Sequence, residues 1–245
     1  MTNKPWSGRC SKATNELVEE FTQSISFDQL LIAHDVAGSI AHAQMLGKCG
    51  IIAKAEADEI VRGLGEVFED ILSGDVEFDP GAEDVHMNVE KMLFDRIGDV
   101  AGKLHTARSR NDQIALDIRL FLKVEIPVAF GLVERLQSAI LEQAEAHVKS
   151  IMPGFTHMQH AQPITLGHHL MAWFWMLERD KGRMADCLAR LDVSPLGSGA
   201  LAGTTFPIDR KFVASELEFG AISDNSIDSV SDRDFISEFL SAAAI

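Results

Sequence analysis

Residues 109–147 read SRNDQIALDIRLFLKVEIPVAFGLVERLQSAILEQAEAH, and the spacing of their apolar side chains decides the fold class. From Ile114 onward, apolar residues recur every three or four positions, which is the pattern of one face of an α-helix. A Ser-x-x-Asp capping pattern, Ser109 to Asp112, marks the start of the helix, and we expect Pro127 to bend it. The stretch therefore predicts one helix of unusual length, of the kind that builds helical bundles.

A second long helix is predicted from Leu166 to Leu191, and shorter ones precede the first. The shorter helices are predicted at Leu30–Cys49, Ala55–Leu72 and His86–Ile97, with an acidic loop between the last two. Almost no segment alternates at period two, so we predict an all-α protein. We expect a small N-terminal helical domain at residues 1–105 and, at residues 106–245, the first long helices of a central bundle.

Composition excludes several classes of protein. The chain has 245 residues and a formal charge of −15, which repels phosphate backbones, so we expect no nucleic-acid partner. The three cysteines are too few and too far apart to build a zinc ribbon or a disulfide framework. No signal-type or membrane-spanning apolar run is present, and we expect a soluble cytoplasmic protein without a membrane partner.

The loop at residues 104–113, LHTARSRNDQ, crowds two arginines and several hydroxyl and amide groups at a helix start. Unpaired N–H groups and the positive end of the helix dipole favour an anion there, and an arginine can bind a carboxylate through two parallel hydrogen bonds. The alternative is that Ser109, Asn111 and Asp112 simply cap the helix. The strongly acidic chain favours an anion-binding role, because two arginines beside Ser109 are locally exceptional.

Residues 153–165, PGFTHMQHAQPIT, connect the two long helices and are bounded by prolines. A histidine here, such as His157, can act as a general acid or base near neutral pH, and Thr156 and Gln159 or Gln162 can orient a substrate. The alternative is an ordinary connecting turn with a surface histidine. His160 follows His157 at the spacing of a metal pair, but no cysteine or carboxylate lies nearby, so we expect no metal.

The third unusual loop, residues 194–205, is rich in glycine but does not predict a nucleotide site. Its three glycines are spaced one residue too widely for a dinucleotide fingerprint, and a helix precedes them instead of a strand. The P-loop pattern G-x-x-x-x-G-K-[ST] does not occur in the sequence. A glycine-rich backbone can still let a ligand or another segment approach closely.

Taken in order, these motifs resemble the argininosuccinate lyase family of the fumarase and aspartase superfamily. The matching stretches are residues 6–9, 24–28, 83–86, 106–113, 154–163, 194–203, 209–210 and 225–240. The resemblance implies a homotetramer that eliminates arginine from argininosuccinate and leaves fumarate, without metal or organic cofactor. It also implies that the long helices of four subunits merge and that loops of three subunits assemble each active site.

The resemblance also assigns roles to individual residues. Arg108, Ser109, Asn111, Thr156 and Gln159 would bind substrate carboxylates, and His157 would be a catalytic acid or its orienting partner. His86 would belong to the active-site region, while Ser24 and Asp28 would lie near the arginine part of the substrate.

Some positions depart from the family pattern. Ala107 replaces a usual glycine, His160 replaces a common arginine, and Ser7 replaces the first of two glycines. No part of the sequence matches the superfamily's serine loop or its Met-Pro-x-Lys-Lys-Asn-Pro signature, so we expect the chain to be inactive alone. Two alternatives stay open, namely a non-catalytic, crystallin-like relative and a sister lyase that acts on adenylosuccinate or aspartate.

Overall fold

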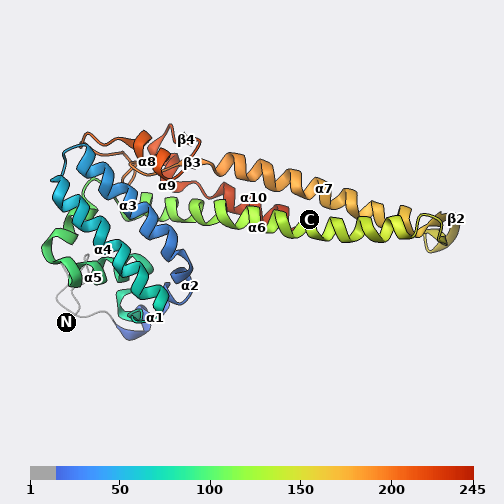
Figure 1. Cartoon of the computed structure of the whole chain (residues 1–245), viewed down its shortest axis with the longest axis horizontal. Helices are drawn as coiled ribbons and strands as arrows, with labels where there is room; N and C mark the ends of the chain where they lie inside the picture. Colours follow the sequence, from blue (N-terminus) through green and yellow to red (C-terminus); the bar gives the residue numbers. More distant parts are fainter. Residues whose placement is uncertain (1–14) are drawn as a thin grey trace. The chain divides into compact units, whose positions relative to one another are not determined.

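The computed structural model describes residues 15–245, and helices dominate it (Figure 1). Within the described residues, the strands form two small two-stranded sheets, so the all-α prediction is confirmed. The matching stretch at residues 6–9 lies outside the described residues. By packing, the chain divides into two compact units: unit 1 comprises residues up to Phe121 and Val193–Asp232, and unit 2 comprises Leu122–Asp192 and Arg233–Ile245. The expected domain boundary at residue 105 stays a prediction.

Unit 1 contains the shorter helices and the start of the first long helix. Its first helices are α1 (Glu16–Thr22), α2 (Ile25–Asp28), η2 (Gln29–Leu31), α3 (Ile32–Lys48) and α4 (Lys54–Ser73). They are followed by η3 (Pro80–Ala82), α5 (Val85–Ile97), η4 (Gly98–His105) and the beginning of α6 (Arg110–Ala146). The later segment adds β3 (Val193–Ser194), α8 (Arg210–Glu216), β4 (Ala221–Ile222) and α9 (Ser226–Ser231), with β3 and β4 paired in parallel. The helices lie within a few residues of the predicted bounds.

The core of unit 1 forms where α3, α4 and α5 pack together. Leu46, Ile60, Leu64 and Leu93 are fully buried there. Helices α3 and α4 approach very closely at Gly47, since a Cβ added at this glycine would lie 2.6 Å from the Cβ of Ala57. This packed core holds α3 and α5 rigidly, and both helices carry candidate site residues.

Unit 2 contains the remainder of α6, a β-hairpin and the helices α7 (Leu166–Leu191) and α10 (Asp234–Ala244). Helix α6 continues through Pro127, and α7 has the predicted bounds. Gln137 on α6 donates from Nε2 to the Phe174 carbonyl of α7 at 3.0 Å, which joins the two long helices. None of the helices among the described residues is long and apolar enough to span a membrane.

The connection between the long helices is a hairpin, which corrects the prediction of an irregular loop. Strands β1 (Ile151–Thr156) and β2 (Gln159–Thr165) pair antiparallel around the two-residue turn His157-Met158. Prolines argue against a strand within a sheet because they lack an N–H donor. In this hairpin Pro153 pairs with Pro163, and each strand has one neighbour, so the missing donors leave no ladder bond unmade.

Candidate active site

The arginine-rich motif enters helix α6 through a capping box. The Ser109 hydroxyl oxygen accepts from the Asn111 N–H at 3.2 Å, and Asp112 Oδ1 accepts from the Ser109 N–H at 2.9 Å. Immediately before it, His42 of α3 is buried with Nε2 2.9 Å from the Thr106 carbonyl oxygen. These bonds fix the backbone from Thr106 to Asp112 and leave the Ser109 and Asn111 side chains at the helix N-terminus.

Asp112 also ties this motif to the glycine-rich loop. Its Oδ2 accepts from the backbone N–H groups of Gly197 (3.0 Å) and Gly199 (2.8 Å), and the side chain is completely buried. Burial raises the pKa of the Asp112 carboxyl, while the three backbone donors oppose that rise. Asn111 adds a third link to the glycine-rich loop, since its Nδ2 donates to the Ala200 carbonyl at 3.0 Å. The glycines therefore hold the motif in place through their N–H groups.

The two arginines of the motif have different surroundings. Arg108 is 7% exposed and donates from Nη1 to the Ser39 hydroxyl at 2.8 Å, so its guanidinium lies inside unit 1. Arg110 is half-buried and donates to Gln113 Oε1 at 2.6 Å, with Nη2 3.1 Å from Glu90 Oε1. Direct binding of a substrate carboxylate by Arg108 stays a prediction, and the charge of Arg108 acts on nearby buried acids.

Ser24 and Asp28 meet the N-terminus of α5. The Ser24 hydroxyl donates to Asp28 Oδ2 at 2.5 Å, and Asp28 Oδ1 accepts from the Val85 N–H at 3.2 Å. The Ser24 N–H donates to the Glu83 carbonyl at 2.8 Å. His86 is the next residue along α5, so unit 1 brings together three of the predicted site residues from two distant segments.

His86 is buried against two carboxyl groups that the sequence prediction did not include. Its Nδ1 lies 2.9 Å from Asp35 Oδ1 on α3 and 3.5 Å from Asp117 Oδ2 on α6. The Gln113 amide and the Arg108 charge also act on Asp35. Asp35 thus links His86 to the arginine-rich motif.

The pKa values of the two carboxyls are shifted in opposite directions. Burial disfavours ionisation of Asp35, but its hydrogen bond to His86, with the charges of His86 and Arg108, outweighs burial and lowers its pKa to about 2. Burial and the neighbouring Asp35 charge raise the pKa of Asp117 well above its ordinary value. The surroundings therefore favour ionisation of Asp35 and disfavour ionisation of Asp117.

A helical face could have revealed this cluster from the sequence. Asp35, Ser39 and His42 are spaced at i, i+4 and i+7 on a helix that is otherwise apolar on that face, and Gln113 and Asp117 are spaced at i and i+4. When the helix is buried, polar residues in such a row need hydrogen-bond partners close by, so the row indicates a polar cluster in the core. The apolar residues of these helices predict their positions in the chain but not this cluster.

The remaining predicted residues, Thr156, His157 and Gln159, lie on the hairpin of unit 2. All three are exposed, and His157 has a φ of 50°, with Met158 at 62°. Two successive positive φ values form the type I′ turn that closes tight hairpins. Of the nine predicted site residues, six thus lie in unit 1 and these three in unit 2.

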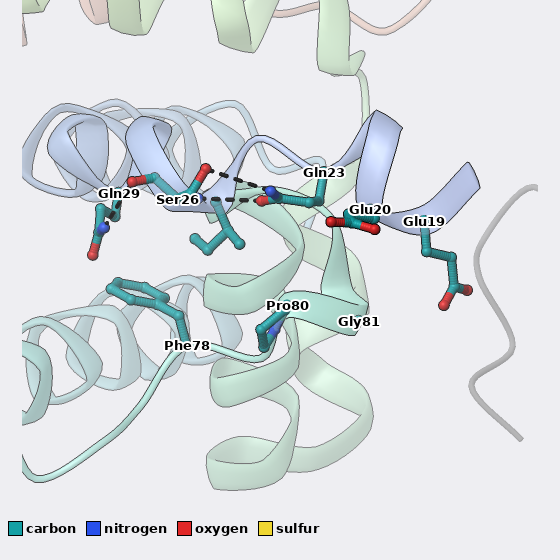
Figure 2. A pocket seen from close by; sticks show the side chains of 9 residues that line it. Glu19, Glu20, Gln23, Ser26, Gln29, Phe78, Pro80 and Gly81 are labelled. Carbon is teal, nitrogen blue, oxygen red and sulfur yellow. Dashed lines mark hydrogen bonds between the residues drawn. The ribbon is translucent and has the colours of Figure 1, made fainter. Parts of the chain in front are cut away.

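A pocket on unit 1 lies apart from these side chains. It has a volume of about 490 Å³ and is lined by α1 and α2 residues together with Phe78, Pro80 and Gly81 (Figure 2). Figure 2 shows Gln23 bonded to Ser26 at its rim. Its lining contains none of the predicted site residues, although Ser24 and Asp28 belong to the same segment.

Comparisons with known proteins identify the family to which the chain belongs. A family model described as "Lyase" matches residues 8–245. The chain belongs to this lyase family. Relatives of the lyase family named argininosuccinate lyase are 59% identical over 99% of the chain in Moorella thermoacetica and 58% identical over 100% in Heliobacterium mobile. The chain spans 52% and 54% of those proteins, about half the length of each.

A solved structure of the lyase family has the same fold. It is an EDDS lyase variant with bound fumarate, 30% identical, with a TM-score of 0.82. The alignment covers 96% of this chain and 47% of that one.

Proposed function

We propose that this chain is the N-terminal half of an argininosuccinate lyase, which eliminates arginine from argininosuccinate and releases fumarate without metal or organic cofactor. The observation that carries the proposal is the identity of 58–59% over essentially the whole chain to proteins of that name. The fumarate in the EDDS lyase variant supports the same product. The role would lie in arginine biosynthesis, in the cytoplasm, and in organisms with a urea cycle the same reaction serves that cycle.

The chemistry of the elimination suits the groups at the α6 N-terminus. Removal of a proton beside a carboxylate builds negative charge on that carboxylate, and fixed donors stabilise it where water is excluded. The Ser109 hydroxyl and the Asn111 amide are such donors at the helix N-terminus, and the buried charge of Arg108 adds to the positive field there. The succinate end of the substrate would bind at this point.

The arginine end requires an acceptor for a guanidinium group. Asp28 carries a carboxylate beside the Ser24 hydroxyl, and carboxylates bind guanidinium through paired charge-assisted hydrogen bonds. His86 follows directly at the start of α5. Ser24, Asp28 and His86 would therefore line the arginine end of the substrate, and the predicted carboxylate-binding residues would line its other end.

Thr156, His157 and Gln159 would complete a site from the hairpin of another subunit. In the proposed homotetramer the long helices pack together and loops of different subunits meet. Exposure of the three side chains in a single chain supports this arrangement, because groups that bind substrate across an interface are free before assembly. His157 would protonate the leaving nitrogen or orient the group that does so.

The test combines this chain with the C-terminal half of the Moorella thermoacetica relative, expressed separately. Fumarate formation from argininosuccinate should appear in the mixture, whereas each half alone should be inactive. Adenylosuccinate, aspartate and ethylenediamine disuccinate are tested in parallel. Turnover of one of these instead would assign a sister lyase, and a folded, tetrameric mixture that turns over none of them would assign a crystallin-like structural role.

A further inference from the structure

The buried cluster in unit 1 contains more ionisable groups than the proposed reaction uses. Asp35, His86 and Asp117 are 1%, 2% and 0% exposed and come from three different elements, α3, α5 and α6. One ligand atom from each lies within 4.8 Å of the others. Because the three groups lie so close together, the charge and protonation of each depend on those of the other two.

The surroundings favour a proton over a metal ion as the balancing charge. Gln113 Nε2 donates to Asp35 Oδ1, and the Arg108 guanidinium acts on both acids, so a dication would face a cation and a donor already in place. With His86 neutral, the positive charge of Arg108 offsets one of the two carboxylates. One negative charge remains, and one added proton removes it.

The hydrogen bonds assign that proton. Neither Oδ1 nor Oδ2 of Asp117 has a hydrogen-bond donor if both acids are ionised, and Oδ2 of Asp35 also lacks one. A protonated Asp117 can donate to Asp35, which satisfies oxygens of both groups. Asp35 then keeps its charge and accepts from His86 at 2.9 Å.

We propose that Asp35 and Asp117 share one proton, which resides on Asp117, and that the pair positions His86 with a proton on Nδ1 and Nε2 available to the site. His86 adjoins Ser24 and Asp28 through the α5 N-terminus, so its orientation sets which ring nitrogen the substrate end of the site meets. The link to turnover rests on the proposed function. The proton state of the cluster does not.

Nitrogen-15 NMR of the histidine side chains of this chain tests the proposal directly. We expect His86 to show a protonated Nδ1, opposite to His42, whose Nε2 must carry the proton to donate to the Thr106 carbonyl. His86→Gln and His42→Gln identify the two signals. An unprotonated Nδ1 on His86, or a proton on both of its ring nitrogens, would overturn the proposal.

Two variants separate the roles of the two acids. Asp117→Asn keeps a neutral group that can donate to Asp35, so the unfolding equilibrium constant at neutral pH should change by less than ~5-fold and Nδ1 should stay protonated. Asp35→Asn keeps an oxygen that can accept from His86 but removes the negative charge that acts on the buried Arg108, so the constant should rise by ~100-fold or more. Equal effects of the two variants would contradict the assignment, and if Asp35→Asn does not fold, the spectrum of Asp117→Asn decides.

Stability as a function of pH gives an independent readout. Because the pKa of Asp117 is raised on folding, its contribution is present at low pH and is lost as pH rises through the folded value. The melting temperature of Asp117→Asn relative to the parent should therefore increase between pH about 4 and about 8. The charged groups that act on Asp117 are Asp35 on α3, His86 on α5, and Arg108 and Arg110 at the start of α6. A flat difference would contradict the shared proton.

The outcomes are distinguishable from failure of the proposed function. In the reconstituted enzyme, a variant whose His86 lacks the proton on Nδ1 should have a lower kcat, and this decrease should be larger than any increase in KM. If the NMR and pH results hold while no lyase activity is found, the cluster stands and the proposed function fails.

Discussion

Ala107 has a φ of 60°, a left-handed backbone that costs a non-glycine residue about 1 kcal/mol. Glycine removes this strain but loses more chain entropy on folding, about 0.4–1 kcal/mol. We therefore expect Ala107→Gly to leave stability unchanged or raise it by up to about 1 kcal/mol, as measured by thermal denaturation. This conformation also gives a physical reason for the glycine that the family pattern has here.

Ala185, an exposed residue inside helix α7, provides the matched control. The same change to glycine there should cost about 1 kcal/mol, because helix interiors disfavour glycine. A loss of that size from Ala107→Gly would show that the backbone strain is absent.

The buried His42, which contacts Thr106 just before the arginine-rich motif, predicts that folding stability depends on pH. Burial, assisted by the Arg108 charge, lowers its pKa from 6.5 to about 3, although the bond to Thr106 opposes this. The folded chain then binds fewer protons than the unfolded chain, so stability is full above pH about 6.5 and falls as pH drops toward 3. His42→Gln should flatten the melting temperature between pH about 6.5 and about 4. A variant curve as steep as that of the parent would assign the acid sensitivity to other groups.

The residue scale also shows what the sequence could not predict. Ser109 and Asp112 were predicted as a cap from their spacing, because the bonds of a capping box are local. The burial of Arg108 and its contact with Ser39 depend on a helix 69 residues away, and no local pattern encodes that. The roles of the nine predicted site residues stay predictions until the variants are measured.

At the scale of single elements, the hairpin turn offers a clean test of His157. Asparagine tolerates positive φ better than most residues, so His157→Asn removes the imidazole and keeps the type I′ turn. In the enzyme reconstituted from two halves, turnover should fall by roughly 100-fold or more while binding changes less. Met158→Asn alters the neighbouring turn position and should leave turnover close to that of the parent. Equal turnover of both variants would make His157 a turn residue alone.

Helices were predicted accurately because their evidence is periodic and repeated. Helix α7 begins at Leu166 and ends at Leu191 as expected, since many apolar positions contribute to the same pattern. The hairpin before it carries two prolines and lacks the Asn-Gly or Asp-Gly pair that usually marks a type I′ turn. The strand signal is therefore hidden, and the polar residues of this stretch predict a loop.

At the scale of the whole molecule, half-exposed apolar side chains gather along the long helices of unit 2. Leu136 on α6 and Trp173 and Met176 on α7 are 50–53% exposed, and they line a groove of about 490 Å³ that Ile245 also borders. Contiguous apolar surface of this kind promotes association in water. Leu72, near the end of α4 in unit 1, is also exposed but does not line this groove.

We therefore expect the isolated chain to self-associate through this face of unit 2, in a concentration-dependent manner visible by sedimentation velocity. Burying a leucine or tryptophan side chain contributes about 1.5–3 kcal/mol, so Leu136→Glu with Trp173→Glu should weaken association by more than ~10-fold. Leu72→Glu, which adds one negative charge at an exposed position of unit 1, should leave it unchanged. A monomeric parent, or equal weakening by both changes, would contradict this role of the long helices. If the face does mediate assembly, Leu136→Glu with Trp173→Glu should also abolish turnover in the reconstituted enzyme, because the hairpin residues would no longer reach the site of a neighbouring subunit.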